Sequence, residues 1–219
     1  FVRACRLLQP KAVILNGDML DGATISRHPP IGWEQRPTLV EEIETVKERL
    51  AEIESAAPNA RKIWTLGNHD GRFETRLATV APEYSKLHGV HLKDHFPNWG
   101  AAWSCWINDD VVVKHRFKGG VHAAHHNALL AGKTMVTGHM HSLKVTPFTD
   151  YQGTRWGVET GTLADPEGPQ FVDYTEDGPK NWRSGFVVLT FHKGRLLWPE
   201  VVHVIGEGEV ECRGRVYSV

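Results

Sequence analysis

The sequence predicts an α/β fold in which short apolar strands end in polar side chains that can bind ligands. Three apolar runs, at 12–15, 62–66 and 134–137, are each followed by a glycine and by metal-ligand residue types. A helical stripe of apolar residues lies between the first two runs. Because the loops that leave the carboxyl ends of strands bind ligands in open α/β sheets, we expect the functional site in these loops.

The amino-acid composition is that of an ordinary globular protein and gives no signal for a membrane protein or a disulfide-rich protein. Of the 219 residues, 41% are hydrophobic and 23% charged, which suffices for one domain with a large core. No apolar run approaches the ~20 residues that cross a bilayer, so we expect no membrane association. The net charge of −1 provides no field that would collect nucleic acid, so a nucleic-acid substrate stays open but has no support in the composition. The three cysteines, at 5, 105 and 212, are widely spaced and predict reduced thiols in a cytosolic setting, so we expect a cytoplasmic location.

Prolines and one apolar run predict the first secondary-structure elements. Residues 1–8 read as the tail of a helix that ends before Pro10, and 12–15 as a buried strand. Residues 23–37 hold three prolines and are predicted to be a loop.

A capping box predicts the start of the next helix. Thr38 is followed three residues later by Glu41, so each side chain can bond the other's backbone N–H. The apolar stripe has steps of four and three residues and predicts a scaffold helix that covers the sheet and ends before Pro58. The stripe consists of Leu39, Ile43, Val46, Leu50 and Ile53.

The rest of the chain alternates between short helices and strands. We predict helices at 74–80 and 123–130. The predicted strands are 111–113, 134–137, 154–159, 186–191 and 195–204. Residues 164–184 are rich in Gly, Pro, Asp and Glu and predict a surface loop.

The central motif is Gly67-Asn68-His69-Asp70, directly after a strand. Glycine allows a sharp turn and a close approach to a ligand. An amide oxygen, an imidazole and a carboxylate then follow in consecutive positions. Alone, this could be a polar turn with an incidental histidine, but the other strand ends carry the same kind of residues.

Four strand ends therefore carry candidate metal ligands: Asp18, Asn68, His115 and the pair His139 and His141. Residues two apart in an extended chain point the same way, so the His-x-His pair could aim both rings into one pocket. This set of nitrogen and oxygen donors without a thiolate suits a divalent transition metal such as Mn, Fe, Zn, Ni or Co.

The order of these motifs resembles the calcineurin-like metallophosphoesterase family across most of the chain. The matching motifs are Gly17-Asp18-x-x-Asp21, Gly67-Asn68-His69-Asp70, the strand-terminal His115 and Gly138-His139-x-His141. The resemblance implies a two-sheet β-sandwich flanked by helices, with a two-metal site at the C-terminal ends of the strands.

The resemblance also implies a role for each residue. Asp18 would bridge two ions, one completed by Asn68, His115 and His139 and the other bound by His141. His69 would be the general acid, and Asp70 would orient it.

One departure concerns the family's N-terminal Asp-x-His motif, which supplies two further ligands and does not occur in these 219 residues. We expect its strand to lie upstream of Phe1. The chain as given would be a single metallophosphoesterase-like domain without its first strand. We therefore expect it to bind one ion well and the second weakly or not at all.

The implied function is hydrolysis of a phosphate mono- or diester by a metal-activated hydroxide, with His69 protonating the leaving group. Arg72 and His28 are candidate substrate-binding residues. The alternative is a catalytically impaired scaffold that binds a protein partner. The motifs define a metal core and leave the natural substrate and the oligomeric state open.

Overall fold

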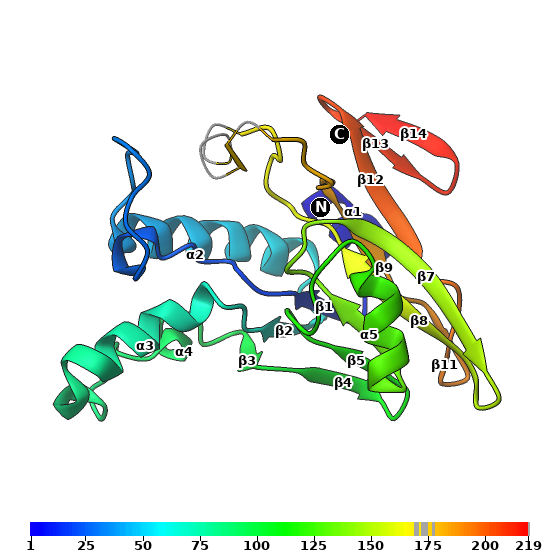
Figure 1. The fold of residues 1–219 in the computed structure, drawn as a ribbon, viewed down its shortest axis with the longest axis horizontal. Helices are drawn as coiled ribbons and strands as arrows, with labels where there is room; N and C mark the ends of the chain where they lie inside the picture. The colour runs from blue at the N-terminus through cyan, green and yellow to red at the C-terminus, as the bar shows by residue number, and fades with distance from the viewer. Residues whose placement is uncertain (169–170, 172–174, 177, 219) are drawn as a thin grey trace. The chain divides into compact units, whose positions relative to one another are not determined.

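The computed structural model describes residues 1–168, 171, 175–176 and 178–218 (Figure 1). It confirms an α/β protein in which several sheets are flanked by helices. The chain divides into two compact units, an N-terminal unit (Val2–Trp103) and a C-terminal unit (Ser104–Val219 with Phe1). Among the described residues, no helix has the length and apolar character needed to cross a membrane.

A three-stranded parallel sheet forms the centre of the N-terminal unit. β1 (Ala12–Leu15) and β3 (Gly100–Ala102) flank β2 (Arg61–Thr65). The predicted strand at 12–15 is confirmed to the residue, and the predicted 62–66 is shifted by one. Parallel pairing brings the carboxyl ends of β1 and β2 to the same edge of the sheet.

Helix α2 (Leu39–Ala56) begins at the predicted capping box. Oγ1 of Thr38 accepts the N–H of Glu41, and Oε2 of Glu41 accepts the N–H of Thr38 at 2.7 Å. The apolar stripe faces the core as predicted: its last four residues are buried and Leu39 is half-buried. Helix α1 (Val2–Leu8) packs against α2.

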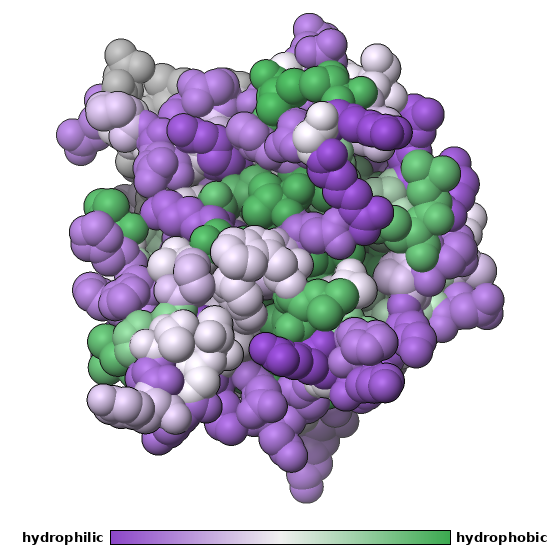
Figure 2. Space-filling model, turned by 90° about the vertical axis from the view of Figure 1, so that its right-hand side faces the viewer, coloured by the Kyte–Doolittle hydropathy of each residue, from purple (hydrophilic) through white to green (hydrophobic). Residues whose placement is uncertain are grey.

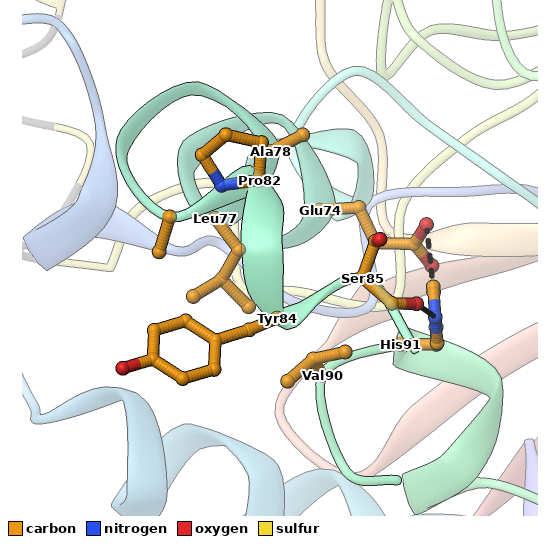
Figure 3. A pocket seen from close by; sticks show the side chains of 9 residues that line it. Glu74, Leu77, Ala78, Pro82, Tyr84, Ser85, Val90 and His91 are labelled. Carbon is orange, nitrogen blue, oxygen red and sulfur yellow. Dashed lines mark hydrogen bonds and ion pairs between the residues drawn. The ribbon is translucent and has the colours of Figure 1, made fainter. Parts of the chain in front are cut away.

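Helix α3 (Asp70–Val80) begins four residues earlier than predicted, directly at the central motif. The 3₁₀-helix η2 (Pro82–Tyr84) and the short helix α4 (Leu92–His95) follow. A small, mostly apolar hollow of about 70 Å³ lies beside α3 and η2 (Figure 3). Its charged side chains, Glu74 and His91, pair with each other at 3.4 Å, so the hollow presents little chemistry to a ligand.

A five-stranded mixed sheet forms the core of the C-terminal unit, in the order β4-β5-β6-β8-β7. The inner strands β5, β6 and β8 run parallel, and the two edge strands run antiparallel to them. The strands are β4 (Cys105–Asn108), β5 (Val111–Val113), β6 (Thr134–Thr137), β7 (Leu143–Asp150) and β8 (Gly153–Thr160). The sequence did not predict β7, which contains Pro147. A proline lacks the ladder N–H and is tolerated on an edge strand.

Helix α5 (Ala123–Ala131) covers this sheet (Figure 1) and approaches β8 very closely. A Cβ placed on Gly157 would lie 1.7 Å from the carbonyl oxygen of Ala124. Only glycine allows this helix and strand to meet at that distance.

A four-stranded antiparallel sheet, in the order β14-β13-β12-β9, completes the C-terminal unit. The predicted strand 195–204 is in fact two strands, because Pro199 interrupts it. The predicted 186–191 also divides. The strands of this sheet are β9 (Gly185–Val188), β12 (Glu200–Gly206), β13 (Glu209–Cys212) and β14 (Arg215–Ser218). A separate two-stranded antiparallel sheet consists of β10 (Phe191–His192) and β11 (Arg195–Leu196). Part of the predicted loop 164–184 falls outside the described residues.

Apolar side chains reach the surface in patches among hydrophilic ones (Figure 2). In the four-stranded sheet, β12 exposes Val204 and Ile205, and β14 exposes Val216 and Tyr217, each by 41–57%. β13 lies between these two strands, and Val204 and Tyr217 share one face of the sheet because both pair with Val210 of β13. Exposed apolar residues on one face of a sheet are a candidate protein-contact surface.

We expect the substitution Gly157→Ala to destabilise the protein by about 1–3 kcal/mol or more, because α5 must move away from β8. The measurement is the free energy of unfolding in urea. The matched control is Gly206→Ala, where an added Cβ meets only the Glu209 carboxylate at 3.6 Å. Equal stability of the two variants would contradict the close packing of α5.

Candidate functional site

In the N-terminal unit, the loop after β1 and the loop after β2 approach each other most closely at Gly67. A Cβ on Gly67 would lie 2.0 Å from Oδ1 of Asp18 and 2.5 Å from its backbone nitrogen. The N–H of His69 donates to the same Oδ1 at 2.9 Å. Asp18 has a φ of +55°, a conformation that costs free energy for a residue with a side chain. The glycine predicted from the motif is therefore required for this close approach.

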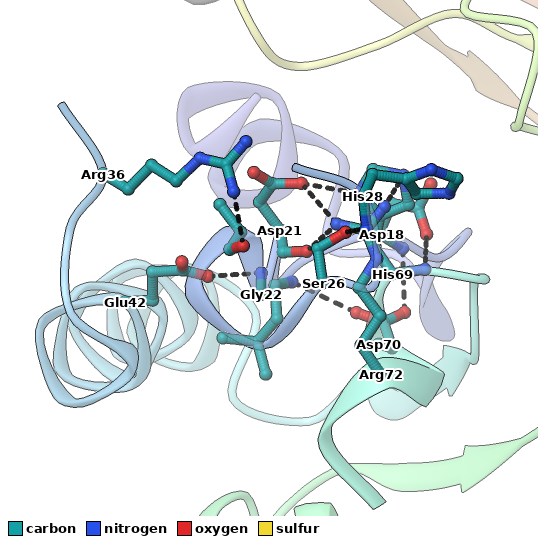
Figure 4. A network of polar contacts seen from close by, with 12 residues as sticks. Asp18, Asp21, Gly22, Ser26, His28, Arg36, Glu42, His69, Asp70 and Arg72 are labelled. Carbon is teal, nitrogen blue, oxygen red and sulfur yellow. Dashed lines mark hydrogen bonds and ion pairs between the residues drawn. The ribbon is translucent and has the colours of Figure 1, made fainter. Parts of the chain in front are cut away.

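The Asp70 carboxylate holds both loops together (Figure 4). Its Oδ2 accepts the N–H groups of Asp18 at 2.8 Å and Gly67 at 2.7 Å, and the indole N–H of Trp64 at 3.0 Å. Its Oδ1 accepts the N–H of Leu20 at 3.1 Å. Asp70 is only 1% exposed, so this carboxylate is an internal structural acceptor.

The predicted role of Asp70 as the orienting partner of His69 is wrong. The carboxylate beside His69 is Asp21, whose Oδ1 lies 2.6 Å from Nδ1 of the ring (Figure 4). Asp70 begins α3 and points toward the loop backbones, where four donors occupy it. Asp21 lies three residues after Asp18 in the same loop, and this spacing is the sequence signal that points to it.

Arg72 contacts both members of the His69–Asp21 pair. Its NH1 group donates to the carbonyl oxygen of Asp21 at 2.7 Å and to Oδ1 at 3.3 Å. Its NH2 group lies 3.2 Å from Nε2 of His69. These contacts assign the tautomer in which Nδ1–H donates to Asp21 and Nε2 accepts from Arg72.

The two carboxyl groups have opposite electrostatic environments. The hydrogen bond from His69 holds the pKa of Asp21 below its usual value, and the Arg72 charge adds to this lowering. Burial raises the pKa of Asp70, while the N–H groups of Gly67 and Leu20 oppose the rise.

Two further predicted residues of this unit are Asn68 and His28. Oδ1 of Asn68 is buried, and no hydrogen-bond donor in the described part of the chain reaches it. A buried amide oxygen without a donor fits the chemistry of a cation ligand. His28 is exposed, with its backbone N–H donating to Ser26 Oγ at 3.1 Å. Its contact with substrate stays a prediction.

In the C-terminal unit, His115 and His139 follow the adjacent parallel strands β5 and β6. The carbonyl oxygen of His115 accepts the N–H groups of Gly138 and His139. Nε2 of His115 and Nδ1 of His139 are consequently 3.3 Å apart. This is the distance of an N–H···N hydrogen bond between the two rings. It also fits a metal, because two imidazole nitrogens bound to one tetrahedral ion at 2.0–2.1 Å would be about 3.3 Å apart.

His141 lies in a turn, so the extended-chain argument for His-x-His does not apply. Its N–H donates to the carbonyl oxygen of Gly138 at 2.9 Å, and its φ is +53°. Its ring packs against Trp182, with centroids 4.7 Å apart. Whether His139 and His141 face one pocket stays a prediction.

The predicted ligands thus form two sets, each held within its own unit. Asp18 and Asn68 belong to the N-terminal unit, and His115, His139 and His141 to the C-terminal unit. The sharing of an ion between the two sets stays a prediction.

Comparisons with known proteins place the fold. No family model matches the sequence, and no curated protein matches it. A crystal structure of a Vps29 double mutant from Entamoeba histolytica matches with a TM-score of 0.50 and 12% identity, covering 100% of this chain and 88% of that one. A single mutant of the same protein matches with a TM-score of 0.42 and 12% identity, covering 94% and 97%. The first match shows that this chain shares the fold of that protein and carries no information on chemistry.

We expect Asp70→Ala to destabilise the protein by at least about 3 kcal/mol, because four buried N–H donors lose their acceptor. The measurement is urea unfolding, with His69→Ala as the control because the side chain it removes is partly exposed. Equal unfolding free energies for these two neighbouring variants would contradict the structural role of Asp70.

We expect the Asp21 carboxyl to titrate below the usual Asp value of about 3.9 and to return toward it in His69→Ala. NMR of the side-chain carboxyl measures both. Because the folded-state pKa is lowered, the pair adds stability above the unfolded pKa and loses it as the pH falls through the folded pKa. An unchanged Asp21 pKa in His69→Ala would count against the pairing.

Proposed function

We propose that the protein is a metal-dependent phosphoesterase. The observation that carries this proposal is the pair of imidazole nitrogens of His115 and His139, 3.3 Å apart at adjacent strand ends. The His69–Asp21 pair adds support, because a carboxylate that bonds one ring nitrogen is the usual setting of an acid–base histidine. The orphaned oxygen of Asn68 supports a cation in the N-terminal unit.

The residues that would hold the metal are those of the two sets described above. We propose that Asp18, Asn68, His115 and His139 hold one divalent transition metal such as Mn, Fe, Zn or Ni, and that His141 belongs to a second, weaker site. A bound divalent ion supplies Lewis acidity and a hydroxide nucleophile at neutral pH.

His69 would protonate the leaving oxygen of the phosphate ester. Asp21 holds Nδ1–H, so His69 would act as the acid in its doubly protonated form, with the second proton on Nε2 in place of the hydrogen bond from Arg72. Arg72 lies beside Nε2 and would contact the phosphate oxygens. A general acid of this kind contributes ~10²–10⁴-fold to the rate.

The second candidate is a scaffold that keeps the fold and binds a protein partner. It is favoured by the exposed apolar side chains of β12 and β14. The fold similarity to Vps29 supports this candidate better than it supports the enzyme.

The test is hydrolysis of p-nitrophenyl phosphate and bis(p-nitrophenyl) phosphate with added Mn²⁺, with EDTA as the control. We expect activity that EDTA abolishes. His69→Ala should lower kcat by ~10²–10⁴-fold with the same Mn²⁺ content. His88→Ala, which removes a histidine side chain that is 87% exposed, should change neither.

Two results would contradict the enzyme. One is a protein that binds Mn²⁺ without turning over either ester, which would favour the scaffold. The other is full activity in His69→Ala, which would remove the general acid from the mechanism.

A further inference from the structure

We propose that Glu159 is a positioning residue that fixes His141 through Ser142. The inference deepens the proposed function, on which it rests for the role of His141 as a ligand of the second ion. Glu159 is the penultimate residue of β8.

Glu159 occupies an unusual place for a carboxylate. It pairs with Thr137 on β6 and with Lys144 on β7, inside the five-stranded sheet, and is 1% exposed. Its Oε2 accepts the hydroxyl of Ser142 at 2.5 Å. The Lys144 ammonium lies 3.6 Å from the same oxygen and donates to the carbonyl oxygen of Val121.

Burying this carboxylate has a free-energy cost that its contacts offset only in part. Within the described residues, Oε1 is buried and has no hydrogen-bond donor. A buried charge with one unsatisfied oxygen is destabilising compared with an apolar residue of similar size. The stability of the sheet therefore does not explain the choice of glutamate at this position.

The hydrogen bond between Glu159 and Ser142 explains the choice of glutamate, because Ser142 is the neighbour of His141. Ser142 directly follows His141. Its hydroxyl and its carbonyl oxygen are both hydrogen-bonded to residues at the carboxyl end of β8 or just after it. The hydroxyl donates to Glu159, and the carbonyl oxygen accepts the N–H of Gly161 at 2.9 Å. An O–H···O⁻ bond of this length belongs to the strong, charge-assisted class.

His141 needs such fixing, because its φ of +53° is disfavoured for a residue with a side chain. On the other side, the N–H of Arg183 donates to its carbonyl oxygen at 2.9 Å, and the Trp182 ring packs on its imidazole. Together with Ser142 these contacts hold the turn in one conformation. A residue whose strained backbone is held in place by several contacts is typical of functional positions.

The test compares Ser142→Ala with Ser142→Thr, which restores a hydroxyl, and with Glu159→Gln, which keeps an acceptor but removes the charge. The matched control is Thr160→Val, which removes the neighbouring hydroxyl that donates to the carbonyl oxygen of Thr137. The first readout is the HN–Hα coupling and shift of His141 by NMR in metal-free protein. The second is Mn²⁺ affinity by calorimetry, with Tm as the stability measure.

We expect Ser142→Ala to change the His141 coupling and weaken the weaker Mn²⁺ site about tenfold or more, with Ser142→Thr close to wild type. Glu159→Gln should keep or raise the Tm, because a buried charge is removed, while weakening the same Mn²⁺ site. Thr160→Val should leave the His141 signals unchanged. If Ser142 and Glu159 had only a structural role, the substitutions would change the Tm without separate effects on the His141 coupling and the Mn²⁺ affinity.

An unchanged His141 coupling in both Ser142→Ala and Glu159→Gln would overturn the inference. The proposed function fails by a different result, namely wild-type protein that binds no Mn²⁺. If the His141 coupling still responds to Ser142→Ala in that case, the positioning role stands without the metal.

Discussion

The polar loops of the N-terminal unit are arranged around one buried carboxylate, that of Asp70. It accepts N–H groups from both loops and from the Trp64 indole. Buried backbone N–H groups without a partner are costly, so these loops can adopt their conformations only with an acceptor at this point. Asp18, His69 and Asp21 take their positions from loops that Asp70 has already fixed.

Parallel strand pairing has the same consequence in each unit. Adjacent parallel strands deliver the residues after their carboxyl ends to one edge, so side chains far apart in sequence meet there. In the N-terminal unit this joins Asp18 with the segment of His69, and in the C-terminal unit it joins His115 with His139. Sheet topology therefore determines which candidate ligands can act together within a unit.

The sequence predicts the pairing of strand ends better than the partners of individual side chains. Helix α2, β1, β5 and β6 follow from capping and apolar pattern, because these signals are local. The partner of His69 is not local: consecutive residues point in different directions, so Asp70 turns inward while Asp21 approaches from another loop. Strand β7 was missed because its Pro147 is compatible with an edge strand only, and edge position is a property of the assembled sheet.

The contact between His115 and His139 does not constrain the segment of chain between them. Their proximity comes from the pairing of β5 with β6 and from the backbone bonds at the carbonyl oxygen of His115. The exposed loop 116–122 that precedes α5 takes no part in either. Insertions and replacements there could diversify what such a protein recognises while the imidazole pair stays the same, so specificity and chemistry can evolve on separate stretches of the chain.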